Sequence, residues 1–219
     1  MAPARRPGEQ VVLPRRAWDV AVEAHQLLSY SGEPLAAGLT DDEVEHVETR
    51  FGFRFAPVHR AFLSVGMPRG PLWPNWRTSS ARDLRRRVQA PVDGVVADVL
   101  EHDFWPARWG ARPEAPAERE AVARRRLAQV PGLVPLFAQC YLPAGDRRPG
   151  APVLTVDRTI VSVVGHDLAH YVGRVFSVHD PVPAGRPPRV PFWSDLVALS
   201  DPSRRGPSIM DPARSRGTR

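Results

Sequence analysis

The stretch that decides the fold is LTDDEVEHVETRFGFRFAPVHRAFLSVG, residues 39–66. It contains the clearest helix start in the chain, because Thr40 can serve as the N-cap and Glu43 follows three residues later to complete a capping box. Apolar residues at helical spacing form the inward stripe of this helix: Val44, Val47 and Phe51. Gly52 is a typical helix stop. The pattern predicts a capped, amphipathic helix.

Further helices are predicted on both sides of this one. Pro57 suits the first turn of a second helix, which we expect to bury Phe62 and Val65. Residues 15–29 predict an earlier helix. Its inward face is expected to hold five residues: Trp18, Ala21, Val22, His25 and Leu28.

Residues 67–130 are predicted to form a helical insert. Two Pro-rich loops carry tryptophans: 66–78 and 104–116. A basic helix begins near Ser80, and we expect Pro91 to break it, so that residues 92–101 form a separate helix. Residues 116–130 predict one more helix.

The strand signals lie in the C-terminal half of the chain. Leu133 to Tyr141 is interpreted as one strand, and residues 151–156 and 159–164 as a hairpin that turns at Asp157-Arg158. Residues 165–176 predict a closing helix. Helices followed by a small antiparallel sheet and then a helix indicate an α+β fold rather than alternating βαβ units.

The net charge of +6 lies in the two ends of the chain. Residues 1–16 carry four Arg and one acid, residues 200–219 carry five Arg and two acids, and the charges between them cancel. All thirty basic residues are arginine. Nucleic-acid binding through the Arg-rich ends stays open as an alternative, but the folded part has no overall basic footprint, so we do not expect nucleic acid to be the partner.

The single cysteine, Cys140, excludes an internal disulfide framework and suits a reducing cytoplasm. It lies in the apolar run VPLFAQCYL, which favours a buried small side chain over a nucleophile. No apolar run approaches the length of a membrane span, and no signal-peptide pattern follows the N-terminal arginines. The sequence therefore predicts a cytoplasmic protein without membrane association and without a cofactor.

The order of features in residues 39–66 resembles the opening signature of the SUKH superfamily. This is the Smi–Knr fold of fungal cell-wall regulators and bacterial toxin-immunity proteins. The shared features are listed in chain order: the Leu-Thr-acidic-acidic start at 39–43, Gly52, the extended step at 55–57 and the pair Phe62-Leu63. LVPLF at 133–137 and PVLTV at 152–156 resemble the core strands of the family, and GHDLAHYVGRVF at 165–176 resembles its closing helix.

The resemblance, which extends to actinobacterial members of the family, implies a domain layout and a function. We expect an N-terminal arm without fixed structure at 1–14 and a SUKH-like α+β domain at 15–180 that contains the insert at about 67–130. A Pro/Arg-rich linker and tail at 181–219 holds a candidate short helix at 192–199. The implied function is a non-enzymatic one: a toxin-immunity or regulatory protein that acts by binding a partner protein, such as a toxin domain.

His166, Asp167 and His170 form the pattern H-D-x-x-H, which is one methylene shorter than the H-E-x-x-H signature of helical zinc proteases. On a helix, both histidines would lie opposite the apolar stripe of residues 165–176. No third-ligand pattern is evident, so we expect a solvated pair and no metal. The alternative function, a metal-dependent hydrolase, would need a closed cleft and a third ligand.

The tryptophans are the candidate partner-binding residues. Trp and Arg are favoured anchors at protein interfaces, although large aromatic side chains more often fill a core. If the chain binds a partner, the first candidates come from the two loops: Trp73, Trp76, Arg77, Trp105, Arg108 and Trp109.

Overall fold

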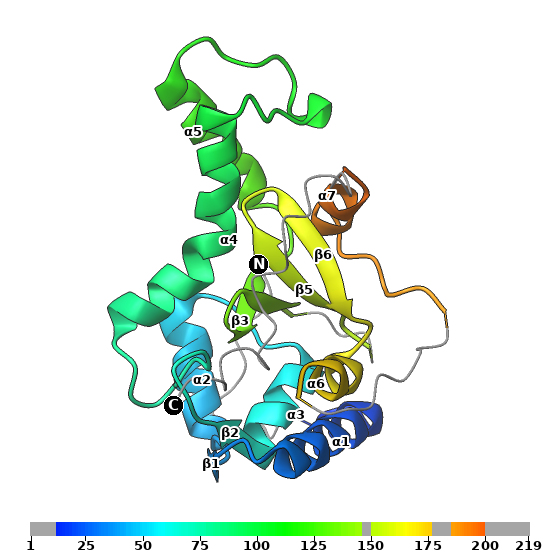
Figure 1. Cartoon of the computed structure of the whole chain (residues 1–219). Helices are drawn as coiled ribbons and strands as arrows, with labels where there is room; N and C mark the ends of the chain where they lie inside the picture. The colour runs from blue at the N-terminus through cyan, green and yellow to red at the C-terminus, as the bar shows by residue number, and fades with distance from the viewer. Residues whose placement is uncertain (1–11, 146–149, 177–184, 200–219) are drawn as a thin grey trace, which may run out of the picture.

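A computed structural model describes residues 12–145, 150–176 and 185–199. They form an α+β fold, as expected (Figure 1). The helices are α1 (Arg15–Ser31), α2 (Asp41–Phe51), α3 (Pro57–Val65), α4 (Ala81–Glu101), α5 (Pro116–Leu127), α6 (Leu168–Phe176) and α7 (Trp193–Leu199), with a 3-10 turn η1 (Ala107–Trp109). The strands are β1 (Leu35–Ala37), β2 (Gly66–Pro68), β3 (Leu133–Phe137), β4 (Cys140–Pro143), β5 (Val153–Asp157) and β6 (Ile160–Gly165).

The centre of the fold is an antiparallel sheet in the order β3-β4-β5-β6. Its side chains alternate between two hydrophobic cores, because successive residues of a strand point to opposite faces. Three of them face one core: Val134, Leu142 and Val153. Three neighbours face the other: Leu133, Tyr141 and Leu154. Since both faces are buried, helices cover both sides of the sheet.

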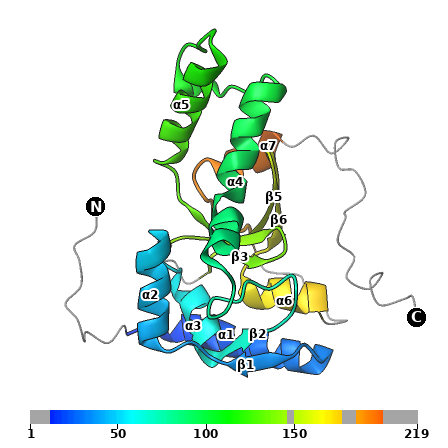
Figure 2. The same ribbon diagram turned by 90° about the vertical axis from the view of Figure 1, so that its left-hand side faces the viewer.

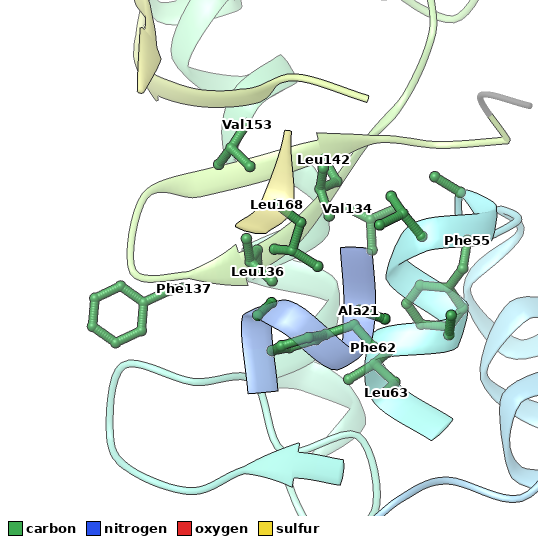
Figure 3. Close-up of a cluster of buried hydrophobic side chains, with 14 of the residues drawn as sticks. Ala21, Phe55, Phe62, Leu63, Val134, Leu136, Phe137, Leu142, Val153 and Leu168 are labelled. Atoms are coloured by element: carbon green, nitrogen blue, oxygen red, sulfur yellow. The ribbon is translucent and has the colours of Figure 1, made fainter. Parts of the chain in front are cut away.

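The lower core lies between the sheet and α1, α3 and α6, with α2 and the β1–β2 ribbon around it (Figure 2). Figure 3 shows Phe62 of α3 and Leu168 of α6 beside the sheet residues Val134 and Leu136. Ala21 of α1 lies next to Phe62 in the same view. Residues far apart in the sequence therefore meet in one core.

The upper core covers the opposite face of the sheet with the second half of α4, with η1, α5 and α7. Trp193 of α7 is fully buried, and its indole N–H donates to the carbonyl of Pro131 at 2.8 Å. The candidate short helix at 192–199 is thus confirmed, and it docks on the sheet. Of the arm predicted at 1–14, residues 12–14 are described and precede α1, and of the linker and tail predicted at 181–219, residues 185–199 are described.

The predicted capping box is confirmed. The Glu43 backbone N–H donates to the Thr40 hydroxyl at 3.2 Å, and the Thr40 backbone N–H donates to the Glu43 carboxylate at 2.8 Å. Gly52 closes α2 with a left-handed φ of 72°, a conformation that glycine adopts without steric strain. The hairpin predicted around Asp157-Arg158 is also confirmed, as β5 and β6.

The single strand predicted from Leu133 to Tyr141 is wrong, because the segment forms two strands. β3 and β4 pair with each other, and Phe137 lies opposite Cys140 across a two-residue turn. Ala138 in this turn has a φ of 47°, and its N–H donates to the carbonyl of Leu72 at 2.8 Å. The turn lacks the Gly or Asn that usually marks such a hairpin, so sequence pattern alone could not place it.

The break predicted at Pro91 is also wrong, since α4 runs continuously from Ala81 to Glu101. A proline inside a helix removes one hydrogen bond and clashes with the preceding turn, at a cost of about 3 kcal/mol. Leu84, before the proline, belongs to the lower core, whereas Val95 and Val99, after it, belong to the upper core. Packing of one helix against both cores outweighs the local penalty.

A buried carboxylate fastens α4 to the β5–β6 hairpin. Asp98 accepts hydrogen bonds from the Thr159 hydroxyl at 2.5 Å, from the Thr159 backbone N–H at 3.0 Å and from Arg158 at 3.1 Å. Burial alone would raise the pKa of Asp98, but these bonds and one to His102 together lower it. The hairpin can approach this closely because Gly94 has no side chain: a Cβ there would lie 2.9 Å from the Arg158 Cα.

We expect Gly94→Ala to destabilise the protein. In an exposed helix interior, the same change would add roughly 0.5–1 kcal/mol of stability. Here the added methyl group meets the backbone of Arg158, so the sign should reverse, with a loss of about 1–3 kcal/mol. Urea unfolding measures the difference. Gly132→Ala is the control, because its Cβ would lie 3.6 Å from the nearest atom, an ordinary contact. A Gly94→Ala variant more stable than the wild type would contradict the close approach.

Two histidines are buried in the lower layer of the molecule. His59 on α3 is 1% exposed, its Nδ1 has no partner among the described residues, and burial lowers its pKa to about 3. His25 on α1 stacks on Phe62, with its Nε2 at 2.7 Å from the Phe62 carbonyl oxygen. Burial lowers the pKa of His25 as well, against the opposing effect of that bond. Both rings are therefore neutral in the folded protein near pH 7.

Acidification from pH 7 to pH 5 should therefore destabilise the fold. Below pH 6.5 the unfolded chain binds a proton at His59 and the native chain does not, so stability falls with pH until the folded pKa of about 3 is reached. At pH 5, His59 alone contributes a loss of about 2 kcal/mol. Urea unfolding at both pH values measures this loss. The variant His59→Leu should have a weaker pH dependence, and an unchanged slope would contradict the assignment to His59.

Candidate protein-binding surface

Three of the four tryptophans named as candidate partner anchors fill the cores, the more frequent role of large aromatic side chains. Trp73 is 4% exposed, Trp76 is 5% and Trp109 is 5%. Trp76 packs edge-on against Phe55, with ring centroids 5.4 Å apart, and Trp73 stacks on Phe176 at 5.5 Å. These three rings have too little surface to meet a partner, so the interpretation of large aromatics as core residues holds for them.

Arg77 joins the first tryptophan loop to the start of α2. Its guanidinium donates to the carbonyls of Ala37 and Gly38 at 2.6 and 2.5 Å and to the Glu43 carboxylate at 2.6 and 2.8 Å. The hydrogen bonds from Arg77 and from Thr40 lower the pKa of Glu43 to about 2. The predicted partner residue is thus occupied by contacts within the chain.

The second tryptophan loop holds α7. Trp109 stacks almost parallel on Phe192, with an interplanar angle of 6° and centroids 6.1 Å apart. Arg108 lies 5.1 Å from the Phe192 ring centroid and pairs with Asp195 at 2.5 Å. Trp105 is half-buried, and its indole N–H donates to the carbonyl of Gly110 at 2.9 Å. All six candidate residues therefore make contacts inside the chain, and the structure divides them between its two ends.

The pattern H-D-x-x-H does not lie on one helical face. His166 and Asp167 precede α6, which begins at Leu168. Asp167 accepts the backbone N–H of His170 at 2.9 Å, as a capping residue does, and the Nδ1 of His170 accepts the backbone N–H of His166 at 3.0 Å. Both rings are half-buried rather than fully solvated. No cluster of three His, Cys, Asp or Glu within the described ranges could hold a metal ion, so the hydrolase alternative gains no support.

Cys140 is buried, as predicted. Burial raises the pKa of its thiol, against the opposing effect of a hydrogen bond with Tyr171. A thiol in this state is a poor nucleophile, because the thiolate is the reactive form.

Cys140 should accordingly resist thiol reagents in the native protein. At pH 8, we expect 5,5′-dithiobis(2-nitrobenzoate) to react at least about tenfold more slowly with the folded chain than with the urea-unfolded chain. The absorbance of the released thiolate measures both rates, and the unfolded chain is its own control. Equal rates would show an accessible thiol.

The exposed aromatic surface of the molecule lies on α1, where sequence analysis predicted core. Trp18 is 38% exposed, Val22 is 42% and Tyr30 is 86%. With Gln26, these residues follow each other at intervals of four, so they form one ridge along the helix. The ridge is about 18 Å long at 1.5 Å per residue.

Small side chains on the opposite side of α1 explain why Trp18 and Val22 face solvent. The inward face of this helix contains three alanines: Ala17, Ala21 and Ala24. They allow α1 to lie close to α3 and α6, a position that larger rings would not permit. Val65, predicted as core at the end of α3, is also exposed. The sequence did contain a signal for this arrangement: the alanines of α1 lie on one side of the helix and the large residues of the ridge on the other. A count of apolar residues does not separate the two sides.

Comparison of the chain with models of known protein families, with curated proteins and with solved structures gave no match. None of the helices in the described ranges combines the length and apolar character that a membrane crossing requires.

Proposed function

We propose that the chain is a non-enzymatic protein-binding domain of the SUKH kind and that the ridge on α1 is its contact surface. The observation that carries the proposal is the exposure of Trp18, Val22 and Tyr30 on one helix. Tryptophan and tyrosine are the side chains most often responsible for binding energy at interfaces. Trp18 and Val22 are neighbours on the ridge, and Tyr30 lies beyond Gln26 on the same side. Exposed apolar groups gathered on one side of a helix indicate a contact site more than scattered ones do.

The shape of the ridge suits another helix or a groove. Side chains four residues apart form the ridges that fit between the ridges of a partner helix. Arg15 is exposed and lies in line with the ridge at the start of α1, where its guanidinium can pair with an acidic group of the partner. The indole of Trp18 and the phenol of Tyr30 each combine a large apolar surface with a polar group, as interface anchors do.

The resemblance to the SUKH superfamily supports a specific use for this surface. An immunity protein of this kind would bind a toxin domain in the cytoplasm and block its active site by surface complementarity. A regulatory interaction protein would use the same surface without a toxin. In both cases the mechanism is binding, because the candidate catalytic groups of this chain, Cys140 and the trio at 166–170, take part in structural contacts.

A native pull-down with the full-length chain tests the proposal. The bait is the wild type, the variant Trp18→Ala/Tyr30→Ala, or the control Leu100→Ala/Ile160→Ala, which also loses two exposed apolar side chains but on α4 and β6. We expect one stoichiometric partner with the wild type and the control. The α1 variant should bind that partner at least about 30-fold more weakly, since loss of an interface anchor costs about 2 kcal/mol or more.

Two outcomes would contradict the proposal. Equal binding of the partner by the α1 variant would move the contact surface elsewhere, and no stoichiometric partner for the folded wild type would argue against a binding function. Co-expression then separates the two uses: a partner that stops growth alone, and is neutralised by the wild type but not by the α1 variant, is a toxin.

A further inference from the structure

A second surface stands out on the first three turns of α4. Four exposed polar residues lie there: Arg82, Arg85, Arg86 and Gln89. At 100° per residue they occupy an arc of about 100° on one side of the helix. The face therefore consists of Arg85 and Arg86 together with Arg82 one turn before them and Gln89 one turn after them. Arg87 lies on another side of the helix. The guanidinium of Arg87 donates to the carbonyls of Pro71 and Leu72.

Among the described residues, the positive charges of this face outnumber the negative ones. Asp83 is the acid in these turns, and both of its oxygens are engaged, one by the Ser80 hydroxyl at 2.9 Å and one by Arg86 at 2.8 Å. Arg82 and Arg85 have no ion pair in the part of the chain that the structure describes. They lie three residues apart, and Arg82 and Arg86 lie four apart, so like charges repel along the helix.

Several other arginines form ion pairs that join segments of the chain. Arg60 pairs with Asp41, Arg108 with Asp195 and Arg112 with Asp103, at 2.5 to 2.7 Å. On α5, Arg124 pairs with both Glu120 and Asp93. Arg82 and Arg85 form no such ion pair among the described residues, so their guanidinium groups are available to a partner. Their position near the positive end of α4 is unfavourable for the isolated helix.

We propose that this face of α4 binds an acidic segment of a partner protein. Carboxylates would neutralise the repelling guanidinium groups and accept their hydrogen bonds in pairs, the geometry for which arginine is suited. A protein segment fits better than nucleic acid, because the exposed face includes no aromatic side chain on which bases could stack. Basic and acidic residues are also nearly balanced over the rest of the described chain, whereas phosphate backbones favour extended basic surfaces.

The proposal extends beyond the α1 ridge and does not depend on it. Figure 2 shows α4 rising from the layer that contains α1 towards the opposite end of the molecule. A binding experiment with short probes therefore tests the α4 face independently of the α1 ridge, which the pull-down tests.

The test is fluorescence anisotropy of the full-length chain with two labelled probes, a peptide of alternating Glu and Ser and a short DNA duplex. The variant is Arg82→Glu/Arg85→Glu. The control is Arg204→Glu/Arg205→Glu, which changes the net charge equally at a site outside the described residues. We expect the peptide affinity to fall at least about tenfold in the α4 variant and to stay within about twofold in the control. Wild-type affinity should decrease when salt is raised.

Three results would overturn the proposal. They are an equal loss in the variant and the control, no binding of the peptide by the wild type, or tighter binding of the duplex that the α4 variant abolishes. The last result would identify a nucleic-acid surface. Folding is not expected to obscure the comparison, because glutamates suit the first turns of a helix better than arginines. Thermal unfolding verifies this, and Arg82→Gln/Arg85→Gln provides the same comparison without charge reversal.

Discussion

Burial of the four-stranded sheet on both faces is the constraint on which the rest of the structure depends. An antiparallel sheet can leave one face in water, but β3, β4 and β5 alternate two sets of apolar side chains, and each set requires a cover. α1, α3 and α6 cover one face. The segment predicted as an insert, 67–130, supplies α4 and α5 for the other, and α7 completes it. The segment 67–130 therefore supplies much of the cover of one face of the sheet.

Local signals in the sequence predicted those parts of the fold that local interactions determine. The capping box at Thr40 and the β5–β6 hairpin need only neighbouring residues, and both were placed correctly. The break at Pro91 and the single strand at 133–141 were wrong, because two cores hold α4 straight and a contact from Leu72 stabilises the turn at Ala138. These contacts join residues far apart in the chain, so no window of sequence reveals them.

Local sequence patterns predicted the candidate binding residues less well than they predicted the fold. Hydrophobicity and periodicity placed Trp18 inside, and the structure reverses that assignment. Trp73 and Trp109 were candidate anchors only if the chain binds a partner, and they fill the cores, as large aromatic side chains more often do. Which side of a helix is buried depends on how closely its neighbours approach. The alanines of α1 determine that distance, and the large rings of the loops fill the spaces between layers. Residue type alone therefore identifies candidate anchors, and burial decides among them.

Polar residues divide into those that hold the fold and those that do not. Glu48 is buried, and its carboxylate is satisfied by Arg54 and by the Phe55 backbone N–H. The carboxylate of Asp98 is satisfied in the same way by the hairpin. A catalytic site needs polar groups that are held in place yet available to a substrate, and these groups are consumed by the fold. The α1 ridge and the basic face of α4 are the opposite case: the ridge exposes large side chains, and Arg82 and Arg85 form no ion pair within the described ranges, so these groups are available to a partner.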